Sequence, residues 1–112
     1  MLLKIVKEDA DVCHLLMHGR LDMAGVSEIE IQFAELTGSA RRSIVIDISE
    51  VPFVASLGMR MFLSAAKRLR DNDKKLVLLK PEKMVSEALH IAGFQHLIAM
   101  ADDESELDAL LK

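Results

Sequence analysis

The chain has 112 residues, of which 51% are hydrophobic and 29% charged, and its formal net charge at pH 7 is −4. This length predicts a single domain, residues 1–112, that can bury roughly two-thirds of its unfolded surface without covalent cross-links. The acidic balance and the absence of Tyr and Trp argue against a nucleic-acid binder, because such proteins use basic patches and stacking rings.

The N-terminal third predicts a β-hairpin followed by a helix. Residues 2–6 and 11–19 read as strands, and the short polar turn between them favours antiparallel pairing. Asp22 is the expected N-cap of the next helix, whose apolar residues recur at helical spacing until Gly38.

Strands and helices alternate along the rest of the chain. Strands are predicted at residues 44–48, 76–79 and 97–100. The helix that Ser56 opens has an apolar stripe ending at Leu69.

Two more helices are expected near the C-terminus. Pro81 suits the first turn of one helix, which Gly93 ends. Its predicted inner face consists of four apolar residues: Met84, Val85, Ala88 and Ile91. Acidic residues at 102–104 favour the start of a last helix. The full order, β-β-α-β-α-β-α-β-α, predicts an α/β fold with a mixed, mostly parallel sheet and helices packed on it.

The most informative stretch is the strand at 44–48 and the helix start after it. An apolar run leads into Asp47, as expected of a buried central strand that ends in a polar turn. Ser56 follows at the helix start, where its hydroxyl is expected to cap the helix by accepting backbone N–H bonds. The same position favours an anion, so Ser56 is also a candidate phosphorylation switch.

Four segments, in order and at fitting intervals, resemble the STAS domain, the fold of bacterial anti-sigma factor antagonists. The segments are Gly19-Arg20-Leu21-Asp22, Asp47-Ile48-Ser49 with Val51 and Phe53, Ser56 with Gly58 and Met59, and Ala92-Gly93-Phe94. The resemblance spans nearly the whole chain. It implies a protein-binding domain and not an enzyme.

The resemblance also implies a switching mechanism. In such domains the unphosphorylated form binds an anti-sigma factor, often a serine kinase of the histidine-kinase-like ATPase type, and thereby frees a sigma factor. Phosphorylation of the loop serine releases the partner, and a phosphatase restores binding. Carried over to this chain, the phosphorylated residue is Ser56, and the role is regulation of transcription through partner switching.

The loop departs from the family pattern at two positions. Ala55 stands where an acid is usual, and Leu57 stands where a second hydroxyl is usual. Some family members are not phosphorylated and serve as docking subunits of lipid transporters or sensor complexes. That role is the alternative interpretation of this chain.

The expected partner-binding surface consists of Asp22, Ser56, Gly58 and Met61. Asp22 belongs to a loop at the same end of the sheet as Ser56. Gly58 lacks a Cβ and so permits a close backbone approach. Met61 offers a flexible apolar contact.

A receiver domain is the rival fold, with Asp47 as its strand-end acid, Glu8-Asp9 as its acid pair and Lys80-Pro81 as its lysine motif. A receiver follows its first strand with a helix, whereas residues 11–19 read as a second strand. The simpler interpretation is that the Asp47 carboxylate accepts hydrogen bonds from nearby backbone amides in a turn.

Catalysis, metal binding and membrane insertion find no support in the sequence. His14 and His18 share a strand face but lie roughly 13 Å apart along it, so they cannot share a metal. A small enzyme with a pocket at the strand-end loops is the rival of another class, but no nucleophile, base and acid are spaced for it, and no cofactor is expected. The lone Cys13, the lack of an apolar run of ~20 residues and the lack of a signal peptide predict a cytoplasmic protein.

Overall fold

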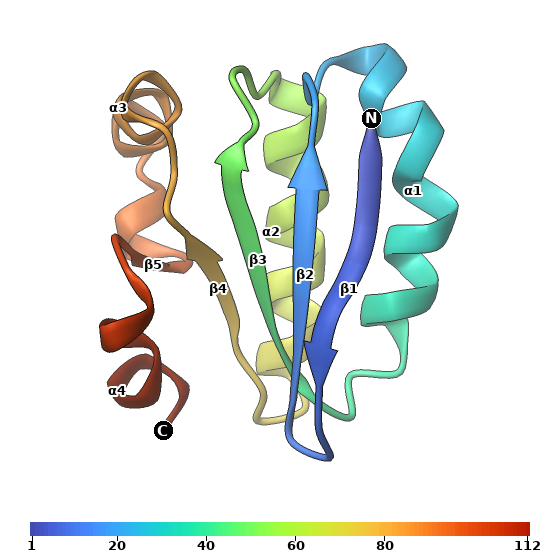
Figure 1. Cartoon of the computed structure of the whole chain (residues 1–112), viewed down its shortest axis with the longest axis vertical. Helices are drawn as coiled ribbons and strands as arrows, with labels where there is room; N and C mark the ends of the chain where they lie inside the picture. The colour runs from blue at the N-terminus through green and yellow to red at the C-terminus, as the bar shows by residue number, and fades with distance from the viewer.

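A computed structural model describes all 112 residues, and five strands form one sheet in the order β1-β2-β3-β4-β5 (Figure 1). The strands are β1 (Leu2–Glu8), β2 (Val12–His18), β3 (Ser43–Glu50), β4 (Leu76–Leu79) and β5 (Ala99–Ala101). β1 pairs antiparallel with β2, and all other neighbours pair in parallel. The predicted α/β fold with a mixed, mostly parallel sheet is confirmed.

The helices cover the two faces of the sheet unequally. They are α1 (Met23–Gly38), α2 (Ser56–Arg70), α3 (Lys83–Ile91) and α4 (Leu107–Leu111), with short 3-10 turns at Phe94–His96 and Glu104–Glu106. Residues of α1, α2 and α3 share one core cluster, while Leu107 of α4 belongs to a second cluster. Figure 1 shows α2 behind the middle of the sheet and α1 beside β1. None of these helices has both the length and the hydropathy that a membrane span needs.

Burial on both faces explains the unbroken apolar run of β3. Ile44, Ile46 and Ile48 pack into the larger cluster with α1, α2 and α3. Val45 points to the opposite face, where it joins the cluster of α4 with Leu107. Because successive side chains of a strand alternate between faces, a central strand covered on both sides must be apolar throughout.

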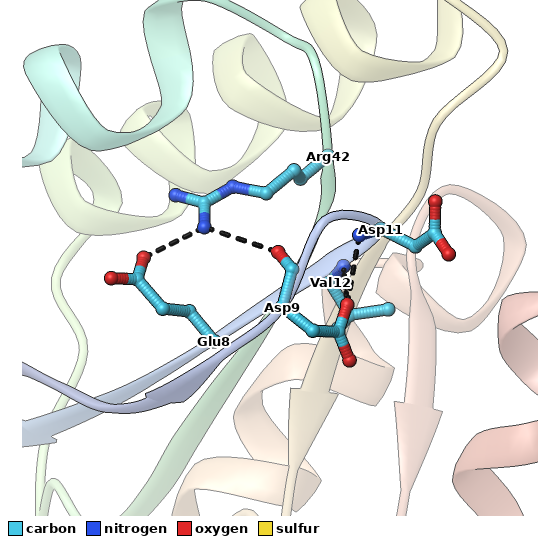
Figure 2. A network of polar contacts seen from close by, with 5 residues as sticks. All are labelled: Glu8, Asp9, Asp11, Val12 and Arg42. Carbon is cyan, nitrogen blue, oxygen red and sulfur yellow. Dashed lines mark hydrogen bonds and ion pairs between the residues drawn. The ribbon is translucent and has the colours of Figure 1, made fainter.

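The hairpin between β1 and β2 is fastened to the start of β3 (Figure 2). The Asp9 carboxylate accepts hydrogen bonds from the amides of Asp11 and Val12 at 2.8 and 2.9 Å, and these bonds lower the pKa of Asp9. Arg42, just before β3, donates to the Glu8 carboxylate at 2.7 Å and to the Asp9 carbonyl at 3.4 Å. The acid pair Glu8 and Asp9 therefore stabilises the turn between the two strands.

The predicted inner face of α3 is wrong at two of its four positions. Val85 and Leu89 are the buried residues of the helix, whereas Met84 is 72% and Ile91 is 89% exposed. Residues 85 and 89 are four apart and form one stripe, and the neighbouring stripe through 84 and 91 faces outward. A short helix near the edge of the sheet buries only the stripe that meets its neighbours.

Two boundaries near the C-terminus also differ from the prediction. Pro81 precedes α3, and Glu82 is the N-cap, accepting bonds from the amides of Met84 and Val85. The last strand begins at Ala99, because Leu97 and Ile98 donate to the Phe94 carbonyl and complete a turn there.

The two stripes of α3 give a matched pair of variants. Leu89→Ala leaves a cavity among buried residues and is expected to lower the free energy of unfolding by about 2–5 kcal/mol. Ile91→Ala removes an exposed side chain and is expected to change it by less than about 0.5 kcal/mol. Urea unfolding of both variants measures the difference. Equal losses would show that the outer stripe is packed against something.

Candidate functional site

The loops that follow β2 and β3 are tied to each other by backbone hydrogen bonds. The Leu21 amide donates to the Phe53 carbonyl, and the Ala55 amide donates to the Leu21 carbonyl, both at 2.9 Å. Leu21 and Val54 form a parallel bridge between these bonds. The starts of α1 and α2 are therefore fixed side by side at one end of the sheet, so the structure brings Asp22 and Ser56 into one region.

Ser56 does not cap α2, contrary to the expectation from sequence. The N-cap is Ala55, in an extended conformation, and no side chain caps the helix. The first helical amide with a backbone partner is that of Met59, which donates to the Ala55 carbonyl at 3.0 Å. Ser56 is the first residue of the helix and is exposed, and the amides from Ser56 to Gly58 have no backbone partner. A hydroxyl beside unpaired amides sits where an added anion is stabilised.

Gly58 makes its close approach inside the domain. The residue is buried, and a Cβ built on it would lie 2.7 Å from Cγ of Leu21. Gly25 has the same role in α1, because its Cβ would lie 2.1 Å from the Arg20 carbonyl oxygen. Each glycine lets its helix start against the loop 20–21, so both helix starts depend on the same short segment.

Asp22 is the N-cap of α1, as predicted. Its Oδ1 accepts a hydrogen bond from the Gly25 amide at 2.9 Å, and its Oδ2 lies 3.5 Å from Nε of Arg20. The Gly25 amide, with a smaller contribution from Arg20, lowers the pKa of Asp22. The carboxylate is therefore ionised at neutral pH, and it stabilises the start of α1.

Apolar side chains are exposed around Ser56. Phe53 is 40%, Leu57 39% and Met23 73% exposed, and the Arg20 guanidinium lies 4.5 Å from the centre of the Phe53 ring. We call these four residues together with Ser56 the Ser56 surface. Exposed apolar groups with an aromatic ring and an arginine are typical of protein-binding surfaces. Met23 and Leu57 were not predicted as surface residues, and only their positions just after helix starts could have indicated their exposure.

Met61 lies beside this surface in a shallow groove. It is half-buried and packs against the core, and it lines a groove of about 230 Å³ between α1 and α2. Leu57 and Arg60 line the same groove. Of the four predicted partner-binding residues, Ser56 is exposed, Asp22 and Met61 are half-buried, and Gly58 is buried.

Asp47 forms the backbone contact predicted for it. Its Oδ1 accepts a hydrogen bond from the Ser49 amide at 2.9 Å, within β3. No three His, Cys, Asp or Glu side chains are grouped to hold a metal ion.

The family model described as "Mlab, STAS domain" matches residues 6–99. This chain belongs to the STAS domain family. The match includes both loops that carry Asp22 and Ser56, so the geometry described above is that of an STAS domain.

Two relatives of known family share this region. The anti-sigma-B factor antagonist of Staphylococcus aureus is 28% identical over 80 residues, which cover 71% of this chain and 74% of that protein. BtrV of Bordetella bronchiseptica is 27% identical over 96 residues, which cover 86% of this chain and 83% of BtrV.

Solved structures share the fold at lower identity. An anti-sigma factor antagonist from Mycobacterium paratuberculosis superposes with a TM-score of 0.82 at 14% identity, covering 97% of this chain and 93% of that chain. Unphosphorylated SpoIIAA gives a TM-score of 0.71 at 17% identity, with 96% and 94% covered. Phosphorylated SpoIIAA from Bacillus gives 0.70 at 16% identity, with 97% and 99% covered.

The glycine contacts predict a selective sensitivity to one methyl group. Gly58→Ala forces a Cβ against Leu21 and is expected to lower the free energy of unfolding by about 1–3 kcal/mol. Gly38→Ala is the control, because nothing lies within 4 Å of its Cβ position, and it is expected to be neutral or stabilising. Denaturant unfolding measures both. A Gly58→Ala protein as stable as its parent would contradict the tight packing of α2 on Leu21.

The depressed pKa of Asp22 predicts a pH-dependent contribution. A carboxylate with a lowered folded-state pKa stabilises the fold above its unfolded value, near 3.8, and this contribution is lost as the pH falls through the folded value. Asp22→Ala is therefore expected to lower the melting temperature by a few degrees at pH 7, while Asp22→Asn retains the cap. The gap between parent and Asp22→Ala should narrow below pH 3.8. A constant gap would show that the charge of Asp22 is not involved.

Proposed function

We propose that this STAS domain is an anti-sigma factor antagonist that binds its partner through the Ser56 surface and is released by phosphorylation of Ser56. The partner is an anti-sigma factor, and in the full scheme it is a serine kinase of the histidine-kinase-like ATPase type, opposed by a phosphatase. The domain itself acts by binding and not by catalysis.

The observation that carries this proposal is the placement of Ser56. Its side chain is exposed at the first position of α2, next to amides with no backbone partner and between the apolar residues Phe53 and Leu57. A kinase can reach such a hydroxyl, and a docked partner would cover it. The name of the Staphylococcus aureus relative, an anti-sigma-B factor antagonist, supports the role.

The charge of a phosphate explains how the switch would work. Phosphorylation adds nearly two negative charges at pH 7 to a surface whose one charged member is Arg20. The start of α2 favours an anion, and Arg60 lies four residues on, along the same side of the helix. The modified domain therefore remains folded, while a partner that fits a neutral hydroxyl among apolar groups is rejected.

A second role keeps the same surface but not the switch. Ala55 provides no side-chain cap, and Leu57 replaces the second hydroxyl of the usual loop. These residues make the surface more apolar, which suits a constitutive docking subunit of a transporter or sensor complex. In that role Ser56 is never modified.

Charge at position 56 separates the two roles. Partners captured by the parent protein from its native cells are identified by mass spectrometry and then purified, and binding is measured by calorimetry. Ser56→Asp is expected to weaken binding of an anti-sigma factor at least tenfold, with an unchanged melting temperature, because the acid is placed at the contact.

The control places the same charge elsewhere. Ser27→Asp adds an acid at an exposed position of α1 outside the Ser56 surface and should bind like the parent. If Ser56→Asp also binds like the parent, the switch is refuted. If the captured partner is instead a transporter or sensor subunit, the docking role takes its place.

A further inference from the structure

A cavity of about 570 Å³ lies at the other end of the molecule, where α2 ends and β4 begins. Arg70 lines it, and Arg70 stands 14 residues after Ser56 on α2, which corresponds to roughly 21 Å along the helix axis. The cavity is thus separate from the Ser56 surface and plays no part in the proposed switch.

The walls of this cavity are mainly apolar and come from α2, β4, β5, α4 and the segment that precedes β5. Leu76 begins β4, Leu97 precedes β5, and Leu110 belongs to α4. β5 pairs only with residues 77–79 of β4, so no strand covers Leu76 on that side. Leu97 is 50% exposed, so this part of the wall is open to solvent.

The rim of the cavity carries an excess of positive charge. Arg70, Lys74 and Lys75 line it together with one carboxylate, that of Asp73. Neither Arg70 nor Lys74 takes part in any of the four ion pairs of the structure, and Lys75 donates to the carbonyl of Lys112. Lys74 is half-buried, so its aliphatic stem adds to the apolar wall while its ammonium group remains at the rim.

We propose that this cavity binds a single-chain anionic amphiphile. The apolar tail lies against Leu76, Leu97 and Leu110, and the carboxylate or phosphate head meets Arg70 and Lys74. The volume falls within the range of roughly 300–1,000 Å³ that small-molecule sites have, and a mainly apolar lining with a few polar groups is the usual composition of such sites. The unpaired cations select the sign of the head group.

Three ten-carbon probes test the head group. Decanoate, decyl phosphate and decylammonium are titrated below their micelle concentrations, and amide chemical shifts are followed by NMR. Saturable shifts at Leu97 and Ala109 are expected with the anions, at least tenfold tighter than with decylammonium. Preference for decanoate identifies a fatty acid, and preference for decyl phosphate identifies a phosphomonoester. Equal binding of decylammonium, or no saturable shift, overturns the proposal.

The length of the ligand's alkyl chain and substitutions in the protein test the apolar wall and the positively charged rim. Decanoate should bind roughly tenfold tighter than octanoate, because each added methylene is buried. Arg70→Glu with Lys74→Glu, and separately Leu97→Glu, alter exposed or half-buried side chains and should each weaken decanoate binding at least tenfold. Lys4→Glu with Lys83→Glu, an equal charge change at two exposed positions that do not line the cavity, should not. Unchanged binding in all the variants would refute the site.

The site is independent of the switch. Ser56→Asp should bind decanoate with the affinity of the parent protein, and loss of that binding would contradict the separation of the two ends. Failure of the proposed function would leave the amphiphile titration unaffected, because the titration uses no protein partner.

Discussion

The arrangement of the candidate site depends on one short backbone contact, the pair of hydrogen bonds between Leu21 and the segment 53–55. This contact joins the two loops that follow β2 and β3, and both helix starts are built on it. Gly58 packs against Leu21, and Gly25 packs against the carbonyl of Arg20, at distances that a Cβ does not tolerate. Ser56 is therefore presented from a fixed backbone, so a change at its hydroxyl alters the charge of the surface without requiring the loops to move.

The two ends of the sheet are built differently. At the hairpin end, the Asp9 carboxylate accepts hydrogen bonds from backbone amides, and Arg42 pairs with the Glu8 carboxylate and donates to the Asp9 carbonyl. At the Ser56 end, the amides at the start of α2 are left without backbone partners, and Phe53 and Leu57 are exposed. Polar groups and apolar area that folding leaves unused are available to a binding partner. This contrast supports the proposal that a protein partner binds at the Ser56 end.

The sequence predicts those parts of the fold in which a local residue pattern is compatible with one type of secondary structure. The apolar run 44–46, bounded by polar residues and rich in β-branched side chains, favours a strand covered on both faces, and Asp22 before a helical pattern is a strong cap. The inner face of α3 was predicted wrongly because Met84 and Ile91 offer a second apolar stripe, and only tertiary neighbours decide between the stripes. The cap of α2 was also predicted wrongly, because the bond from Ala55 to Leu21 starts the helix one residue earlier than a serine cap would require. Gly25 packs against the carbonyl of Arg20, five residues earlier, because of the path by which the loop enters α1, and the sequence pattern did not predict that path.

The most direct test of the switch is the phosphorylation state of Ser56 in the protein isolated from its native cells under several growth conditions, measured by intact-mass and peptide mass spectrometry. The account predicts that a fraction of the protein carries one phosphate, located on Ser56 and removed by phosphatase treatment, and that this fraction is absent from the partner-bound pool. Protein that is wholly unmodified at Ser56 under every condition, both free and bound, would contradict the account and leave the docking role.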